Sequence, residues 1–237
     1  MTLVNQSILQ LKKNNKPNIG AIVIGQSPRP EIEAEFFHIA GNSANLLLRG
    51  ALDALSRKEI DSLVPEDDAD TLFTRLPNGD GVTISKKQVV RHGRDQLDIL
   101  HKDGVAIIIL LCTGNFPEWE NRNGLLFPSR TVAAMVSGLL PKGKIGVFSP
   151  LEEQCAQTKK RWEQRGYEVV STSLSPNATS NEAAMAAEAM VDHAPELLIF
   201  DCISYTRETK HIISSKTATP AILGISCAIR SAMELID

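Results

Sequence analysis

Short apolar runs alternate with amphipathic stretches of helical length along most of this chain, and this alternation constrains the fold more than any other feature. Several of the runs, such as residues 105–111 and 197–200, are almost wholly apolar, as expected of strands buried on both faces of a parallel sheet. The pattern therefore predicts an α/β fold built from βαβ units. The predicted strands are residues 19–24, 105–111, 145–148, 168–171, 197–200 and 221–223, and the predicted helices are 31–49, 86–102, 129–139, 151–164, 181–193, 207–215 and 226–235.

One segment departs from this alternation. Residues 71–75 and 82–85 have strand character and flank an Asn78-Gly79 pair. Asn-Gly is a strong signal for a tight turn between antiparallel strands. The sequence therefore predicts a β-hairpin here.

The chain also contains an internal repeat. Asn18–Ile24 runs through Gly25-Gln26 into Ser27-Pro28, and Lys144–Phe148 runs into Ser149-Pro150, so both segments read as a strand that runs into Ser-Pro, followed by acidic residues and a helix. Later in each half an apolar strand ends in a cysteine, Cys112 in the first half and Cys202 in the second. The repeat predicts two related α/β halves, and the alternative is the general likeness of all α/β units.

Composition and charge exclude several classes of protein. Of the 237 residues, 43% are hydrophobic and 22% charged, which is typical of globular domains. A net charge of −3 argues against nucleic acid as a partner. No apolar run approaches the roughly 20 residues that span a membrane, and residues 1–16 lack the apolar core of a secretory signal. We therefore expect a cytoplasmic protein with no membrane partner.

The cysteines and histidines do not have the spacing of metal ligands. Cys112, Cys155, Cys202 and Cys227 are far apart, and no pair forms the Cys-x-x-Cys motif of zinc ribbons or thioredoxins. The five histidines are scattered, and no glycine-rich nucleotide-binding loop occurs. The sequence therefore predicts neither a metal nor a cofactor.

Two cysteines are the predicted catalytic residues. Cys112 and Cys202 each follow a predicted strand, and ligands of open α/β sheets bind beyond the carboxyl ends of the strands. Two thiols on opposite sides of a small acid can move a proton at carbon, since one thiolate abstracts it and the other thiol delivers one. The alternative is that both are buried structural cysteines. Strand alternation predicts that Asp201 points to the face opposite Cys202.

A polar loop before the first predicted helix is the predicted anion-binding element. The N–H groups at a helix N-terminus favour a carboxylate or phosphate, and Arg29 can bind one with two parallel hydrogen bonds. The alternative is a turn built by Pro28 and Pro30, with Arg29 in solvent and Ser149 as a simple helix cap. The predicted substrate-binding residues are Gln26, Ser27, Arg29, Thr113, Gly114, Ser149, Tyr205 and Thr206.

These motifs resemble the AroM-like family, within the aspartate/glutamate/hydantoin racemase superfamily. The resemblance spans nearly the whole chain. It implies two pseudo-symmetric parallel-sheet lobes of racemase-like type with an inter-lobe cleft, in which a small carboxylic acid or other small anion binds. It places the first lobe at residues 1–127 plus 217–237 and the second at 128–216. The segments that carry it are Ile24-Gly25-Gln26-Ser27-Pro28-Arg29-Pro30, Leu110-Leu111-Cys112-Thr113-Gly114, Ile145-Gly146-Val147 and Asp201-Cys202-Ile203-Ser204-Tyr205.

The chain departs from the racemase pattern beside both thiols. Racemases have Asn-Thr after the first cysteine and Thr-His after the second, whereas this chain has Thr113-Gly114 and Ile203-Ser204. The glutamate enzymes also have an acid before the loop serine, where this chain has Gln26. The acid and the histidine are the positions that assist the thiols in racemases.

Two functions therefore remain open. The leading prediction is a cofactor-independent isomerase or racemase-like enzyme that acts on a small carboxylic acid with two cleft cysteines. Racemisation, cis–trans isomerisation and decarboxylation are all compatible with it, as is a homo-oligomer. The alternative is a non-catalytic protein that binds a small anion or metabolite and has kept the racemase-like cleft.

Overall fold

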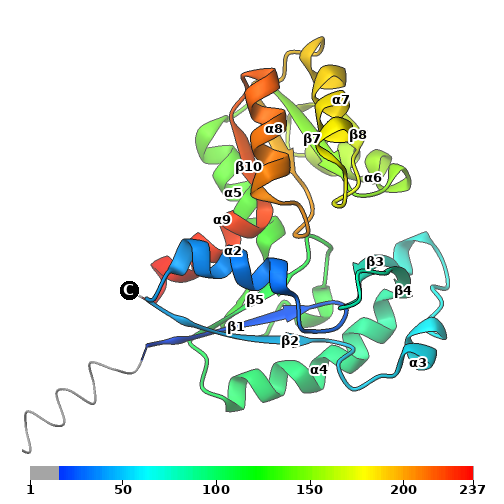
Figure 1. Cartoon of the computed structure of the whole chain (residues 1–237), viewed down its shortest axis with the longest axis vertical. Helices are drawn as coiled ribbons and strands as arrows, with labels where there is room; N and C mark the ends of the chain where they lie inside the picture. The colour runs from blue at the N-terminus through cyan, green and yellow to red at the C-terminus, as the bar shows by residue number, and fades with distance from the viewer. Residues whose placement is uncertain (1–15, 237) are drawn as a thin grey trace, which may run out of the picture. The chain divides into compact units, whose positions relative to one another are not determined.

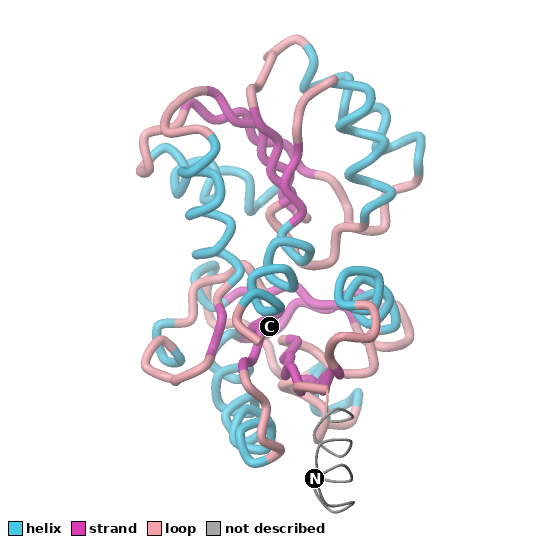
Figure 2. Tube along the Cα trace, turned by 90° about the vertical axis from the view of Figure 1, so that its left-hand side faces the viewer, coloured by secondary structure: helices cyan, strands magenta, loops and turns pink. Residues whose placement is uncertain are grey.

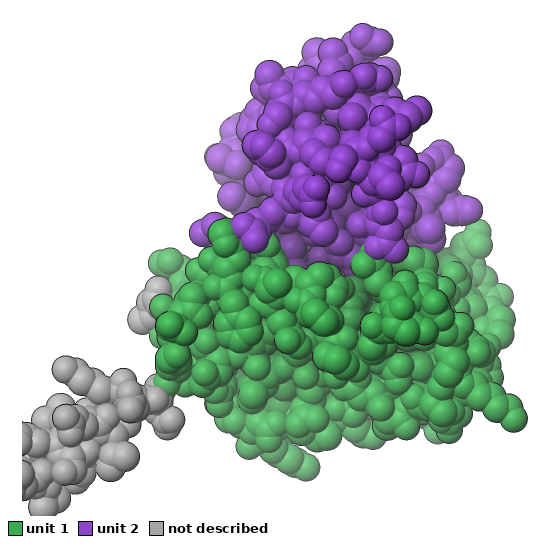
Figure 3. Space-filling view, in the orientation of Figure 1, with its two compact units in different colours: residues 1–110, 116–125, 232–237 green, residues 111–115, 126–231 purple. Residues whose placement is uncertain are grey.

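The computed structural model describes residues 16–236, which form two compact units (Figure 3). Of the described residues, the first unit comprises 16–110, 116–125 and 232–236, and the second comprises 111–115 and 126–231. Apart from Lys16, the N-terminal segment considered for a secretory signal lies outside the described residues.

The first unit is built on a four-stranded sheet in the order β2-β1-β5-β6. Strands β1 and β2 are parallel, with Asn18 opposite Asn45. Every residue of β5 is buried, as predicted for a strand covered on both faces. Helix α4 packs against β1 and β2 (Figure 1). The elements are β1 (Asn18–Val23), α2 (Pro30–Ala40), β2 (Asn45–Gly50), α3 (Arg57–Asp61), the 3-10 helix η1 (Asp68–Asp70), β3 (Thr71–Arg75), β4 (Gly81–Ser85), α4 (Lys86–Lys102), β5 (Ile107–Leu111), the 3-10 helix η2 (Pro117–Trp119) and β6 (Leu125–Leu126).

The predicted helix over residues 31–49 is wrong in its second half. Helix α2 ends at Ala40, and Gly41 follows with φ 54°, a backbone conformation that glycine adopts without strain. After that break the chain forms β2, whose three leucines pair with β1. An apolar run of this length fits a strand as well as a helix. This run is a strand because its backbone pairs with the edge of β1.

The predicted hairpin is confirmed. Strands β3 and β4 are antiparallel, with Thr71 opposite Ser85 and Arg75 opposite Gly81. Gly79 has φ 91°, and the Gly79 N–H donates to the Leu76 carbonyl at 2.9 Å. The turn therefore uses the conformational freedom that the Asn-Gly signal indicates.

The second unit is a four-stranded sheet in the order β10-β9-β7-β8, and its three strand pairs are all parallel. Helices flank the strands on both faces (Figures 1 and 2). Its elements are α5 (Pro128–Leu139), β7 (Lys144–Ser149), α6 (Glu152–Glu163), β8 (Glu168–Ser173), α7 (Ser180–Val191), β9 (Leu197–Phe200), α8 (Arg207–Thr217), β10 (Ala221–Leu223) and α9 (Gly224–Glu234), of which the last turn belongs to the first unit.

Alternation along β7 divides the core of the second unit between the two faces of its sheet. Ile145 and Val147 pack on one face in a buried cluster with Val136 of α5 and Trp162 of α6. Phe148, which points the other way, stacks on Phe200 with ring centroids 5.0 Å apart. The strands are therefore apolar on both sides, as their sequences predicted.

The strand order confirms the internal repeat. Within each four-stranded sheet, the strand that comes second in the chain lies at an edge and the strand that comes first lies beside it. The sheet's third and fourth strands in chain order then follow. The second unit extends further toward the C-terminus than the predicted boundary of residue 216, because β10 pairs with β9. Residues up to Ser231 therefore belong to the second unit, and only residues 232–236 of the described C-terminal segment belong to the first.

Candidate functional site

Cys112 lies immediately beyond the carboxyl end of β5, in a short loop that belongs to the second unit. The Gly114 N–H donates to Cys112 Sγ at 3.3 Å, which orients the thiol. Burial is the largest cause of a rise in the pKa of Cys112 to about 12, to which the nearby Cys202 and Asp201 contribute and which the Gly114 N–H and Arg161 oppose. The resting form of Cys112 at neutral pH is therefore the protonated thiol.

The loop of Cys202 is joined to the loop of Cys112. Strand β9 ends at Phe200, so Asp201 and Cys202 lie beyond the strand, where strand alternation no longer sets the direction of a side chain. Thr113 Oγ1 donates to the Asp201 carbonyl at 3.1 Å. The second unit therefore brings together the two strand ends that carry the predicted catalytic thiols.

The buried carboxylate of Asp201 lies beside Cys202 in the chain and was not among the predicted site residues. Asp201 is buried, with 8% exposure, and it forms an ion pair with Arg161 of α6. Burial raises the pKa of Asp201, and Arg161 and the Thr113 hydroxyl oppose that rise. Arg161 also donates to the Thr113 carbonyl at 3.4 Å. Nothing in the sequence indicated Arg161 as a site residue, because it is one of several charged residues on α6 and has no distinguishing spacing.

Tyr205 and Thr206 make internal hydrogen bonds. The buried Tyr205 hydroxyl donates to the Leu174 carbonyl at 2.6 Å, and burial raises its pKa well above the usual range. Thr206 caps α8, where its hydroxyl accepts from the Thr209 N–H at 3.1 Å. Both hydroxyls are therefore engaged within the protein, and their predicted contact with a substrate stays a prediction.

Ser149 is buried at the end of β7, with 1% exposure. The hydroxyls of Ser149 and Ser171 lie close to the Cys155 thiol and oppose the rise that burial causes in its pKa. Neither hydroxyl oxygen forms a hydrogen bond of standard geometry with another described residue. Cys155 is a buried residue of α6, and it sits among polar groups rather than in a purely apolar core.

The predicted anion-binding loop of the first unit is held by a carboxylate that the sequence analysis missed. Asp53 Oδ1 accepts from the Ser27 N–H at 2.7 Å, and Asp53 Oδ2 accepts from Ser27 Oγ at 2.8 Å and from the Gly50 N–H at 2.7 Å. Gln26 Nε2 donates to the carbonyls of Leu52 and Leu55 at 3.1 and 2.8 Å. Asp53 was missed because it follows β2, which the sequence analysis assigned to a helix.

Arg29 is buried, with 3% exposure, and its guanidinium has protein partners. Its Nη2 lies 2.6 Å from Glu31 Oε1, and its Nη1 donates to the Arg75 carbonyl at 3.3 Å. The alternative of an arginine in solvent is therefore wrong. An incoming carboxylate has to share this guanidinium with Glu31, and the predicted anion binding stays a prediction.

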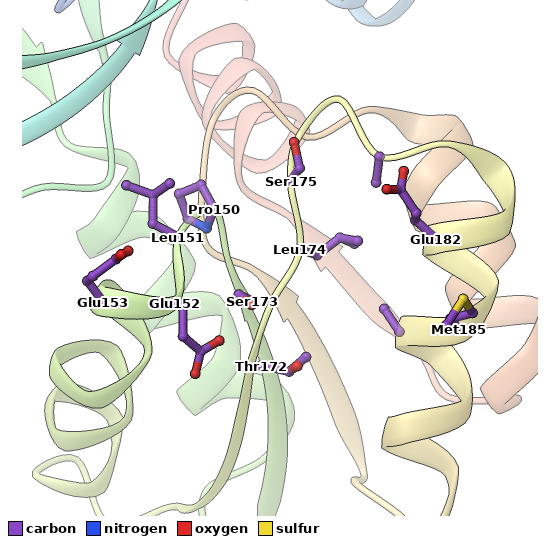
Figure 4. A pocket seen from close by; sticks show the side chains of 12 residues that line it. Pro150, Leu151, Glu152, Glu153, Thr172, Ser173, Leu174, Ser175, Glu182 and Met185 are labelled. Atoms are coloured by element: carbon purple, nitrogen blue, oxygen red, sulfur yellow. The ribbon is translucent and has the colours of Figure 1, made fainter.

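A pocket of about 530 Å³ lies in the second unit at the carboxyl ends of β7 and β8 (Figure 4). Its lining includes the carboxylates of Glu152, Glu153 and Glu182, with no lysine or arginine, so like charges disfavour an anion there. Of the residues that line it, none is a predicted site residue. The lining residues are Pro150, Leu151, Glu152, Glu153, Thr172, Ser173, Leu174, Ser175, Ala178, Glu182, Met185 and Ala186.

Residues 16–236 contain no group of three or more His, Cys, Asp or Glu side chains arranged to hold a metal ion. No helix in this part of the chain has both the length and the apolar character needed to cross a membrane.

Comparison with solved structures identifies the fold. Arylmalonate decarboxylase matches with a TM-score of 0.62 and 13% identity, over 93% of each chain. The maleate isomerase Iso from Pseudomonas putida S16 matches with a TM-score of 0.61 and 12% identity, over 92% of each chain. Glutamate racemase from Francisella tularensis subsp. tularensis SCHU S4, in complex with D-glutamate, matches with a TM-score of 0.57 and 14% identity, over 93% of this chain and 81% of the racemase. At these identities the likeness shows that this chain has the same fold as these proteins.

The profile of a protein family described as AroM protein matches residues 19–236. A search of curated proteins finds no match.

Proposed function

Since the chain belongs to the AroM protein family, and since its fold is that of the racemase superfamily, we propose that it is a cofactor-independent enzyme that moves a proton at carbon on a small carboxylic acid. Cys112 and Cys202 are the acid–base pair. The observation that carries the proposal is the joining of the two cysteine loops by the Thr113–Asp201 hydrogen bond.

The environment of Cys112 sets the direction of the first proton transfer that we propose. Cys112 rests as a thiol, because burial raises its pKa to about 12, and it is therefore the proton donor of the first turnover. Cys202, as the thiolate, takes the proton from the α-carbon, whose electron pair passes into the substrate carboxylate. The Cys112 thiol then protonates that carbon on its other face and becomes a thiolate. Atoms and charge balance within the pair, so the reaction needs no cofactor.

The substrate-binding residues form two groups. Thr113, Gly114, Ser149, Tyr205 and Thr206 lie in the second unit, where Thr113 and Gly114 adjoin Cys112 in the chain. Gln26, Ser27 and Arg29 are proposed separately as an anion-binding loop of the first unit, supported by the buried guanidinium of Arg29. A cytoplasmic location is also proposed, because none of the four cysteines, all in the described part of the chain, forms a disulfide.

A binding protein without catalysis is the second candidate. It is favoured by the raised pKa of Cys112, which leaves little thiolate at neutral pH, and by the internal hydrogen bonds of Tyr205 and Thr206. In this case the racemase-like fold binds a small anion, and the two thiols are structural.

Hydrogen exchange distinguishes the candidates. The protein is incubated in deuterium oxide with aspartate, glutamate, hydantoins, arylmalonates and maleate, and proton NMR follows both label at the α-carbon and conversion of the acid. For the enzyme we expect label or conversion with at least one acid. Replacement of Cys112 or Cys202 by Ser should slow it by roughly 10²–10⁴-fold, the range of general acid–base catalysis.

Cys227→Ser is the matched control, because Cys227 is also a half-buried thiol of the second unit. It should leave the rate unchanged. Calorimetric binding of an acid that shows neither label nor conversion would favour the binding protein. Equal rates in all three variants and the unmodified protein would remove the two-thiol mechanism.

A further inference from the structure

Arg161 contacts both loops that carry the proposed catalytic thiols. It lies in the last turn of α6, with its side chain 37% exposed. Its Nη1 donates to the carbonyl of Thr113, the residue after Cys112, at 3.4 Å. Its Nη2 forms an ion pair with the carboxylate of Asp201, the residue before Cys202. A single guanidinium therefore bridges the ends of β5 and β9.

The bridge is closed by a third link. Thr113 Oγ1 donates to the Asp201 carbonyl at 3.1 Å, so the two loops are joined directly as well as through Arg161. The Asp201 side chain is 6% exposed, and a carboxylate buried this deeply is costly without a counter-ion. Arg161 supplies that counter-ion. Its removal would leave a buried negative charge beside both thiols.

We propose that Arg161 is a positioning residue of the two-thiol site, which holds the Cys112 and Cys202 loops together and neutralises Asp201 beside them. The inference rests on the proposed function for its catalytic meaning. Its physical content, the control of Cys112 ionisation by the Arg161–Asp201 pair, is independent of any substrate.

The charges around Cys112 predict the direction in which each substitution changes the ionisation of its thiol. The groups whose charge or dipole acts on the Cys112 thiol are Cys202, Asp201, Arg161 and the Gly114 N–H. Loss of the Arg161 charge leaves Asp201 to oppose thiolate formation. Loss of the Asp201 charge leaves Arg161 to favour it. The two neutral substitutions should therefore act in opposite directions, whereas a merely structural bridge would expose the thiol in both.

The test is the rate of Cys112 alkylation by iodoacetamide in the intact protein, followed by peptide mass spectrometry from neutral to alkaline pH. Relative to the unmodified protein, we expect Arg161→Gln to slow alkylation about tenfold and Asp201→Asn to accelerate it about tenfold. Each change corresponds to a pKa shift of about one unit, at the low end of what a neighbouring charge produces. Arg161→Lys keeps the charge and should restore most of the rate.

Lys160→Gln is the matched control, because Lys160 is an exposed cation one residue earlier on α6. It removes the same charge and should leave alkylation unchanged. Circular dichroism verifies that each variant is folded. If Arg161→Gln does not fold, Asp201→Asn and Arg161→Lys still carry the test, since acceleration by the first and a near-normal rate in the second are both required.

The outcomes separate the two proposals. Opposite shifts in Arg161→Gln and Asp201→Asn support the positioning role even if no acid exchanges deuterium, in which case only the proposed function fails. Acceleration in both variants, or a change in Arg161→Gln no larger than in Lys160→Gln, overturns the positioning role. Where an exchanging acid is found, Arg161→Gln should lower its rate of exchange and Arg161→Lys should restore it.

Discussion

Replacement of Asp53 by Asn tests whether one carboxylate fixes the loop that follows β1. Asp53 accepts three hydrogen bonds, from the Ser27 N–H, from Ser27 Oγ and from the Gly50 N–H, at 2.7, 2.8 and 2.7 Å. Two of the three donors are backbone N–H groups, one on each carboxylate oxygen. The substitution is nearly isosteric, so it changes charge and hydrogen bonding rather than volume.

The expected loss follows from the geometry. Asparagine keeps one acceptor oxygen and places an NH₂ donor where the other oxygen was. Whichever way the amide is turned, either the Ser27 N–H or the Gly50 N–H faces a donor and loses its acceptor. A buried N–H without an acceptor costs about 1–3 kcal/mol. Because Asp53 is half-buried and water reaches part of the site, we expect a decrease of about 1–2 kcal/mol in the free energy of unfolding.

The two tryptophans provide the assay, because Trp119 lies in the first unit and Trp162 in the second. In a Trp162→Phe background, the fluorescence of Trp119 reports on urea unfolding of the first unit. With a dependence of about 2 kcal/mol per M urea, the Asp53→Asn midpoint should fall by about 0.5–1 M. Asp95→Asn, the same change on the exposed face of α4, is the control and should not shift the midpoint. Equal midpoints for the two variants would refute the role assigned to Asp53.

Three further predictions use other parts of the chain. Alkylation of Cys112 by iodoacetamide should rise about tenfold per pH unit from neutral to alkaline pH, because its pKa is raised to about 12; a plateau near neutral pH in peptide mass spectrometry would contradict this. Thr179→Ala should lower the free energy of unfolding by about 1 kcal/mol, because the Thr179 hydroxyl caps α7 in a capping box with Glu182. The Thr179 N–H and hydroxyl lower the Glu182 pKa from its ordinary 4.5, so the part of the stabilisation that comes from the ionised Glu182 is present above pH 4.5 and is lost as the pH falls through the lowered value. The difference in urea unfolding between the variant and the unmodified protein should therefore narrow in acid without vanishing, because the Glu182 N–H still donates to the Thr179 hydroxyl. Gly50→Ala should destabilise the protein by about 1–3 kcal/mol, since its Cβ would lie 2.5 Å from the Gly25 carbonyl oxygen. Gly138→Ala in α5 should stabilise the protein by about 0.5–1 kcal/mol, because its Cβ would meet nothing within 4 Å. Shifts of the same sign for the two variants in thermal unfolding would show that the reasoning is wrong.

The sequence alone determined the class of fold and several of its local features. Buried strands are recognisable because both faces must be apolar, and the Asn78-Gly79 turn is recognisable because its backbone conformation needs glycine. The internal repeat is recognisable because each half contains a strand that runs into Ser-Pro and a later strand that ends in cysteine. These signals are local, so no knowledge of the packing is required.

Only the tertiary structure decided which groups meet at the strand ends. Residues 45–50 are a strand because the edge of β1 was open to them, and that pairing carries Asp53 to Ser27. Arg161 lies 40 residues from Asp201 and 48 from Thr113, and only the packed second unit makes one guanidinium the partner of both. The ionisation of Cys112 likewise depends on its burial and on charges from distant segments of the chain. Local propensity carries no information about such contacts, because they form between elements that are apart in the sequence and are fixed only when the sheet and its helices bury their apolar faces together.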